Sequence, residues 1–177
     1  MLRPLLAAAI LAPSLALASG GGGSSAPKPS ETTQTCTGGK VWDKKTKSCV
    51  DPQHSFLSDD ELYQAVREFA YFGDLAHAQS ALSAMSDQDE DRVLTYWGFT
   101  YRKLGEIDRG MAYYRAALTT NPANILARSY MGQALVEQGD LQGARHQLLK
   151  IREFNGKGTW AETALYNSIT TGQTYSY

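Results

Sequence analysis

The side chains best suited to chemistry are few and widely spaced. The three histidines, His54, His77 and His146, have no histidine partner four residues away and no acidic residue at metal-ligand spacing. A zinc site needs three or four ligands held close together. Each histidine is therefore interpreted as a solvated side chain.

A run of carboxylates, Asp87-Gln88-Asp89-Glu90-Asp91, is the other candidate, because carboxylates bind calcium. The run lacks the glycine and the closing glutamate of an EF-hand loop. Negative charge is favoured at a helix N-terminus, so the run is interpreted as a turn followed by a helix start. No nucleotide-binding loop, H-E-x-x-H or G-x-S-x-G motif occurs either. The sequence predicts no catalytic residue, no metal site and no cofactor.

Cys36 and Cys49 are the two cysteines of the chain. An even pair in an exported chain predicts a disulfide, and the spacing differs from the C-x-x-C of redox proteins. Lys40-Val41-Trp42 alternates as in a short strand, so the prediction is a disulfide-closed hairpin over residues 36–52. This segment resembles the small disulfide knots of some carbohydrate-binding modules.

The N-terminus is typical of an export signal. Arg3 precedes an apolar run from Leu5 to Ala18 that ends in the small-x-small pattern Ala16-Leu17-Ala18. The run is shorter than the roughly 20 residues that span a bilayer. The prediction is a signal peptide at 1–18, with an uncleaved anchor as the alternative, and a periplasmic or secreted protein without stable membrane insertion. A flexible Gly/Ser/Pro-rich linker is predicted at 19–35.

Charge excludes one class of partner. Residues 19–56 carry five Lys and Arg against three Asp and Glu, whereas residues 57–177 carry eleven against fifteen. Nucleic-acid binding needs a basic face. The mildly acidic main segment therefore predicts no nucleic-acid partner.

From residue 57 the pattern becomes helical, with apolar residues three and four positions apart. Ser58 and Glu61 form a capping-box signature before the first helix, and Thr159 and Glu162 repeat it before the last. Three Gly-acid-aliphatic triplets, beginning at Gly73, Gly105 and Gly139, stand 32 and 34 residues apart. Five residues after each glycine comes a small residue: Ala78, Gly110 and Ala144. Such a period predicts a repeat protein.

The repeat resembles that of the tetratricopeptide repeat (TPR) family. Residues 91–124 carry eight signature positions: Trp97, Gly98, Tyr101, Gly105, Gly110, Tyr114, Ala117 and Pro122. Gly132, Gly139 and Ala144 follow in the third unit. The resemblance implies an all-α solenoid over 57–170, with helix hairpins at about 59–90, 91–124 and 125–158, a capping helix at 159–170 and a tail at 171–177.

The glycines and large apolar residues of this signature are also expected from the packing of helices. A glycine within a helix costs about 1 kcal/mol relative to alanine, so Gly98, Gly110 and Gly132 are expected where neighbouring backbones approach closely. Leu94, Trp97, Gly98, Tyr101 and Leu104 share one helical face, which is predicted to be core.

The resemblance also implies a concave surface lined by the first helix of each pair, where a peptide would bind. The residues carried over to that surface are Tyr63, Arg67, Tyr71, Thr95, Phe99, Arg102, Lys103 and Gln133. Thr95, Phe99 and Arg102 lie about 120° from the core stripe, so they are expected to be exposed. An aromatic ring among cations suits an acidic or C-terminal peptide; the alternative is a solvated helix face. The two-carboxylate clamp of chaperone-binding members is not reproduced, because Thr95, Leu126 and Gln133 do not fit it.

The predicted function is a non-catalytic scaffold that mediates protein–protein interactions in the cell envelope. One alternative is a glycan-binding protein, in which Trp42 of the hairpin stacks on sugar and Lys44, Lys45 and Lys47 meet acidic groups. Another is a structural subunit that self-associates through the ends of the repeat array.

Overall fold

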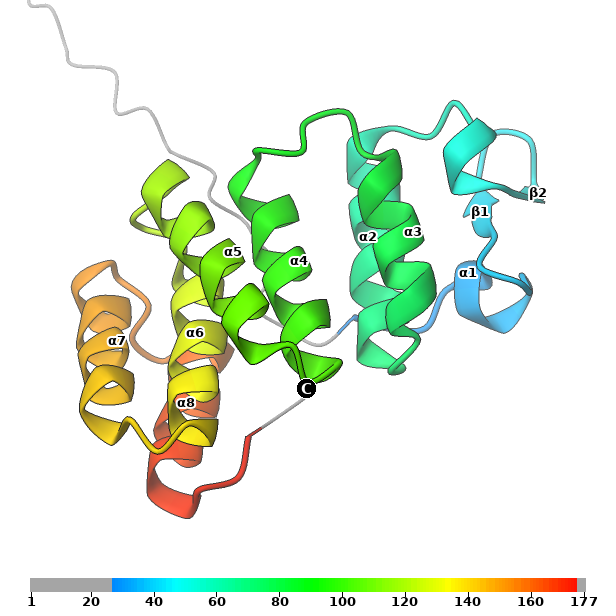
Figure 1. The fold of residues 1–177 in the computed structure, drawn as a ribbon. Helices are drawn as coiled ribbons and strands as arrows, with labels where there is room; N and C mark the ends of the chain where they lie inside the picture. Colours follow the sequence, from blue (N-terminus) through cyan, green and yellow to red (C-terminus); the bar gives the residue numbers. More distant parts are fainter. Residues whose placement is uncertain (1–26, 175–177) are drawn as a thin grey trace, which may run out of the picture.

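The computed structural model describes residues 27–174 (Figure 1). The predicted signal peptide at 1–18 and the first part of the predicted linker, 19–26, lie outside the described residues. So do residues 175–177 of the predicted tail. Within residues 27–174, no helix is long and apolar enough to cross a membrane.

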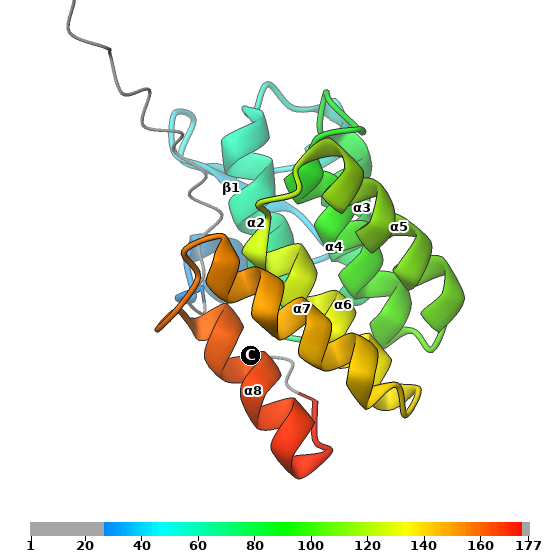
Figure 2. The same cartoon turned by 90° about the vertical axis from the view of Figure 1, so that its left-hand side faces the viewer.

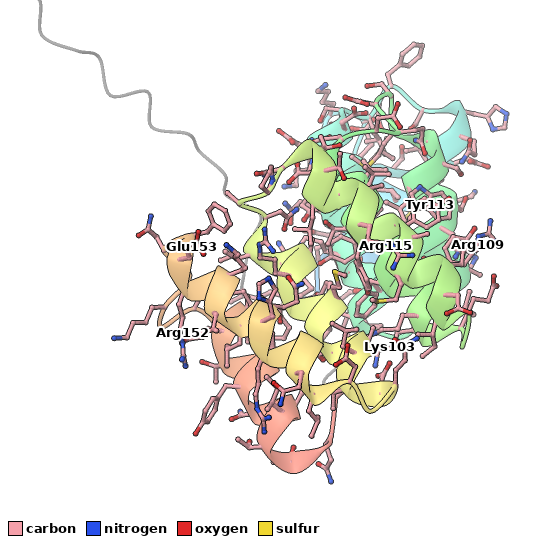
Figure 3. All side chains as sticks on the ribbon, turned by 60° about the vertical axis from the view of Figure 1, so that its left-hand side comes forward. Lys103, Arg109, Tyr113, Arg115, Arg152 and Glu153 are labelled. Atoms are coloured by element: carbon pink, nitrogen blue, oxygen red, sulfur yellow. A yellow bond between two sulfur atoms is a disulfide. The ribbon has the colours of Figure 1, made fainter. Side chains whose placement is uncertain are left out.

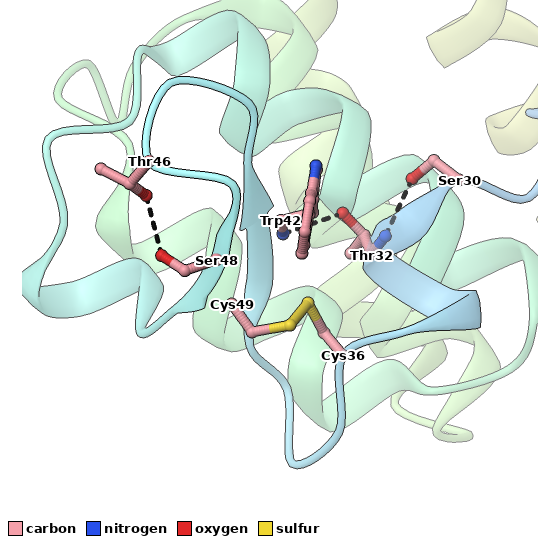
Figure 4. The surroundings of a disulfide bond; sticks show 7 residues. All are labelled: Ser30, Thr32, Cys36, Trp42, Thr46, Ser48 and Cys49. Carbon is pink, nitrogen blue, oxygen red and sulfur yellow. Dashed lines mark hydrogen bonds between the residues drawn. A yellow bond between two sulfur atoms is a disulfide. The ribbon is translucent and has the colours of Figure 1, made fainter.

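The N-terminal part of the described chain is the predicted hairpin. Strands β1 (Val41–Asp43) and β2 (Ser48–Val50) pair antiparallel, with Trp42 opposite Cys49. Cys36 and Cys49 form the predicted disulfide, which ties β2 to the segment before β1 (Figure 4). A short 3-10 helix, η1 (Pro52–His54), leads into the helical region and packs on it.

The predicted linker does not remain free as far as residue 35. Helix α1 (Glu31–Gln34) begins after Ser30, whose side chain caps it. The carboxylate of Glu68, a residue only 4 % exposed, accepts hydrogen bonds from the Ser30 amide and hydroxyl, both at 2.7 Å, and from the Thr33 hydroxyl. A buried carboxylate needs such donors, and these hydroxyls supply them, so this end of the linker is attached to the helical region.

The predicted helix pairs are all present. The first pair is α2 (Asp59–Tyr71) and α3 (Leu75–Ala84), the second α4 (Asp91–Lys103) and α5 (Ile107–Thr120), and the third α6 (Ile125–Glu137) and α7 (Leu141–Glu153). Helix α8 (Trp160–Thr171) follows. The fold class predicted from the sequence, packed helix pairs behind a small disulfide-closed hairpin, is confirmed.

The pairs stack in chain order into two layers. The first helices of the pairs, α2, α4 and α6, contact one another in series and form one layer. The second helices, α3, α5 and α7, form the other layer (Figures 1 and 2). Helix α8 packs on both α6 and α7 and so covers the end of the third pair. Helix α1 and the hairpin lie at the opposite end, beside α2 (Figure 1).

Glycine is required at two kinds of place in this stack. Gly73, Gly105 and Gly139 turn the chain within each pair with φ of 77°, 86° and 80°, in the left-handed region that favours glycine. Gly98 and Gly110 let α4 and α5 touch: a Cβ on Gly110 would lie 2.8 Å from the Gly98 carbonyl oxygen. The predicted close approach of these two backbones is confirmed.

The core is continuous across the pairs and rich in tyrosine. Tyr96, Tyr114 and Tyr130 are fully buried, as are Ala117 and Ala144 of the repeat signature. Burial raises the pKa of the Tyr114 phenol, so this side chain stays neutral inside the core. One predicted core residue is misplaced: Leu104 is 52 % exposed, because α4 ends at Lys103 and Leu104 belongs to the turn.

Removal of the disulfide tests whether the bond stabilises the hairpin alone or the helices as well. Closing a loop with a separation of 13 residues stabilises by about 3 kcal/mol in the chain-entropy model. In the Cys36→Ser/Cys49→Ser variant, the amides of β1 and β2 are therefore expected to exchange with solvent about a hundredfold faster. Amides of α4 and α5 should keep their exchange rates, because these helices do not contact the hairpin region closely. Native-state hydrogen exchange measures both, and equal acceleration in both regions would contradict local stabilisation.

Candidate functional site

Three of the residues predicted to face a partner are buried. Thr95, Phe99 and Arg102 of α4 are 1 %, 0 % and 3 % exposed. The Phe99 ring centroid lies 5.9 Å from that of Tyr96 and 4.9 Å from that of Tyr130. The expectation that these side chains escape burial is wrong, because α4 contacts helices of both neighbouring pairs and buries more than one stripe of its surface.

Thr95 is used to join two pairs. Its hydroxyl donates to the Asp91 carbonyl oxygen at 2.6 Å and accepts from the Asn124 side-chain amide at 3.1 Å. The Asp91 carboxylate accepts from the side-chain amides of Asn121 and Asn124 at 2.8 and 2.7 Å. The predicted helix start at Asp91 is confirmed, and these bonds hold the beginning of α6 against α4.

Arg102 is a buried cation at the C-terminal end of α4. Its Nη1 donates to the Tyr130 carbonyl oxygen at 3.1 Å, and its Nε lies 3.9 Å from Oε2 of Glu137. Its guanidinium carbon lies 5.9 and 6.0 Å from the ring centroids of Phe99 and Tyr130. Within residues 27–174, neither Nε nor Nη2 has a hydrogen-bond acceptor.

Lys103 and Tyr71 keep part of their surface exposed. The Lys103 ammonium nitrogen lies 6.0 Å from the centroid of the Phe99 ring. Burial, and then the charge of Arg102, lower the pKa of Lys103.

Tyr63, Arg67 and Gln133 are also buried, at 3 %, 6 % and 0 % exposure. Tyr63 packs edge-to-face on Tyr96, and the Arg92 guanidinium lies over its ring at 4.9 Å. We name six residues of α2, α4 and α6 the inner-face cluster: Arg67, Phe99, Arg102, Lys103, Tyr130 and Gln133.

A cleft of about 750 Å³ lies between the hairpin and α2. We name it the hairpin cleft. Trp42 and Lys44 line it from the hairpin, and Tyr63, Arg67 and Arg92 line it from the helices. Two residues predicted for the concave surface, Tyr63 and Arg67, therefore border a space that a ligand can enter.

Tyr130 and the hairpin cleft were not predicted from the sequence. Tyr130 stands 34 residues after Tyr96, at the repeat period, so a systematic comparison of the units would have shown both as core positions. The cleft has no such signal, because hairpin and α2 residues come together only through the packing of α1 on α2 and of β1 on α1.

The aromatic signature residues form a separate group between α4 and α5. Trp97, Tyr101 and Tyr113 lie with their rings nearly parallel and centroids 5.4–6.1 Å apart. The Arg109 guanidinium caps this stack 3.7 Å from the Tyr101 ring centroid. Arg109 and Tyr113 project from α5 (Figure 3). The faces of these rings contact one another and Arg109, so this group of side chains stabilises the packing of α4 on α5.

The histidines and acidic residues considered as metal ligands are not grouped into a site in the described part of the chain. His77 is not simply solvated: its Nδ1 lies 2.6 Å from Oδ2 of Asp74, and its ring packs closely against Gly39 of the hairpin segment. The described part of the chain holds no group of three or more His, Cys, Asp or Glu side chains placed to bind a metal.

These features define a class of protein, a stack of antiparallel helix pairs with a cation-bearing inner layer. Residues 101–162 match the tetratricopeptide repeat family. The matched segment runs from the end of α4 to the beginning of α8. Repeats of this kind are typically non-catalytic modules that bind proteins or peptides. Comparison with curated proteins and with solved structures gives no match.

Proposed function

We propose that the chain is an exported, non-catalytic scaffold of the cell envelope that binds a segment of another protein in the cleft between its hairpin and helix α2. The matched repeat supports a binding role. The Cys36–Cys49 disulfide supports an oxidising compartment, where such bonds persist. The observation that carries the proposal is the hairpin cleft, which brings aromatic and cationic groups from two separate elements to one opening.

The charges of the cleft indicate an acidic or extended peptide as the occupant. The Asp60 carboxylate is paired with Arg92 at 2.5 Å, the Glu61 carboxylate accepts from the Ser58 amide, and Glu68 is held by Ser30 and Thr33. Two exposed lysines, Lys28 and Lys44, line the same cleft, and neither forms an ion pair within the described chain. The free positive charge is thus available to a partner's carboxylates.

Site-specific crosslinking tests the proposal. Gln64 is exposed and lines the cleft, whereas Ala116 is exposed on α5, in the other helical layer. A photoreactive residue at position 64 is expected to give a discrete adduct with one envelope protein, and the same residue at position 116 to give none. Lys28→Glu with Lys44→Glu should reduce the adduct about tenfold or more, because both changes repel an acidic segment. Equal labelling from both positions, or none from position 64, would contradict a partner site in the cleft.

Glycan binding is a second candidate, favoured by one observation. Trp42 is only partly buried and lines the hairpin cleft beside Lys44, a combination that suits sugar stacking. Lys45 and Lys47 are exposed but do not line the cleft. Pull-down of the full chain on peptidoglycan or chitin, with Trp42→Ala as control, distinguishes this candidate. The full chain is needed because Val41 belongs to the helical core.

Self-association through the ends of the stack receives less support. Helix α8 covers the third pair, and α1 and η1 pack on the first pair. End-to-end stacking would have to displace these elements. The mass measured by size-exclusion chromatography at several concentrations separates an oligomer from a monomeric scaffold.

A further inference from the structure

A second cleft, of about 740 Å³, lies between α1 and the turn that leads from α2 into α3. We name it the α1 cleft. Its lining comes from residues 32–34 and 36–39 on one side and from Phe69, Phe72, Asp74 and His77 on the other. Among the described residues, Thr32 alone borders both this cleft and the hairpin cleft. The volume is in the range of small-molecule sites, so the α1 cleft is a candidate site of its own.

Phe72 gives the α1 cleft an accessible aromatic wall. It is the C-cap residue of α2 and is 52 % exposed. Its ring meets that of Tyr71 edge-to-face, with centroids 5.2 Å apart. Phe69 is buried, and its ring lies 5.9 Å from that of His77. A ligand in the cleft can therefore place an apolar group against Phe72, and the face of such a ring attracts a cation.

Asp74 is the one carboxylate among the described residues that line the α1 cleft, and no lysine or arginine is among them. Its side chain is 43 % exposed. Oδ2 lies 2.6 Å from Nδ1 of His77, and Oδ1 accepts from the His77 amide at 3.3 Å. Because a carboxylate has about four lone-pair sites, Asp74 can also accept hydrogen bonds from a ligand. With the imidazole neutral, the lining has one negative charge and no positive one.

A second carboxylate lies behind the wall that α1 forms. The Thr33 hydroxyl, which borders the cleft, donates to Glu68. The other donors to this carboxylate are the Ser30 amide and hydroxyl, so all three are neutral groups. The potential in the α1 cleft therefore favours a positively charged ligand.

We infer that the α1 cleft binds an ammonium or guanidinium group carried on an apolar stem, with the cation at the Asp74 carboxylate and the stem against Phe72. This chemistry occurs in free organic amines and in the lysine and arginine side chains of proteins. The inference goes beyond the proposed function, because it concerns a different cleft and a ligand of the opposite charge.

Nuclear magnetic resonance of the full chain tests the class of ligand. Phenylethylamine is expected to shift the amide signals of residues 37–39 and 72–77, with a dissociation constant in the millimolar range or tighter. Phenylpropionate, which carries a carboxylate on a similar stem, should leave these signals unchanged because Asp74 repels it. Equal shifts with the two compounds, or shifts confined to Trp42 and Gln64 of the hairpin cleft, would overturn the inference.

Asp74→Asn tests the charge without removing the helix cap. Asparagine is as good an N-cap residue as aspartate, so α3 should keep its start. The affinity for phenylethylamine is expected to fall about tenfold or more, because the charge-assisted hydrogen bond is lost. Asp140→Asn is the matched control, since Asp140 caps α7 in the same way and lines neither cleft. Equal losses for both variants, or a loss for neither, would refute a role for Asp74.

Phe72→Leu tests the aromatic wall at an exposed position, where the substitution does not disturb the core. Leucine keeps an apolar side chain but has no ring face for the cation, so the affinity should fall about threefold or more. An unchanged affinity would contradict stacking on Phe72. Circular dichroism of each variant shows whether the fold is retained.

The source of the cation is distinguished by a blocked tripeptide with lysine between two alanines, with glutamate in place of lysine as its control. Tighter binding of the lysine peptide than of phenylethylamine assigns the cleft to a protein side chain, and the reverse order assigns it to a free amine. If neither compound binds, the inference is wrong. Asp74 and Phe72 do not line the hairpin cleft, so such a failure has no bearing on crosslinking from position 64.

Discussion

Tyr130→Ala is expected to lower the free energy of unfolding by about 3–5 kcal/mol, the range for removing a large buried aromatic side chain. Tyr130 is fully buried, and its ring contacts Tyr96 and Phe99 of α4, Tyr114 of α5 and Trp160 of α8. One side chain thus joins the second pair, the third pair and the final helix. The cavity left by alanine weakens all of these contacts together, and the melting temperature should fall by roughly 10 °C or more.

Tyr166→Ala is the matched control for this change. Tyr166 lies on α8 and is 50 % exposed, so the same substitution there should cost less than about 1 kcal/mol. Urea denaturation followed by circular dichroism gives both values. Similar losses for the two variants would show that Tyr130 does not join the helix pairs as described.

Gly110→Val is expected to destabilise the chain by about 3 kcal/mol or more, at the upper end of the range for overpacking. A Cβ at this position would lie 2.8 Å from the Gly98 carbonyl oxygen and 3.1 Å from the Arg102 amide nitrogen. These are backbone atoms of α4 that cannot move without separating the two helices. Even Gly110→Ala should destabilise, although alanine is the better helix former by about 1 kcal/mol.

Ala112→Val serves as the control on the same helix. Ala112 is exposed on α5, so valine there should cost only the few tenths of a kcal/mol of its lower helix propensity. Thermal unfolding of the three variants gives the comparison. An increase in stability for Gly110→Ala would mean that α4 and α5 do not touch at this point.

The local features of the fold could be predicted because each depends on residues close together in the chain. Ser58 and Glu61 form the predicted capping box. The period set by Gly73, Gly105 and Gly139 located the turns, because a left-handed backbone conformation favours glycine wherever it occurs. Cys36 and Cys49 predicted their disulfide from composition and compartment alone.

The candidate site was predicted only in part. The sequence identified the helices that line the inner layer, and it named residues of the inner-face cluster such as Arg67 and Arg102. It did not give their exposure, because helical periodicity describes one helix with one buried stripe. Phe99 is buried because α4 has neighbours on both sides, and how many sides of a helix are covered depends on the stacking of the pairs.

The helices, their turns and the small residues at their crossings could be read from the amino-acid sequence, since they follow from local backbone preference or from a repeated spacing. The disulfide could be read from the even pair of cysteines. Three features came from the packing of the fold: Ser30 and Thr33 bind Glu68, the hairpin forms a cleft with α2, and Arg102 is buried beside Glu137, which accepts from Thr174. The Ser30–Glu68 hydrogen bond, for example, joins residues 38 positions apart in the chain. The formation of these features depends on how complete elements pack, and no short pattern of residue types encodes that.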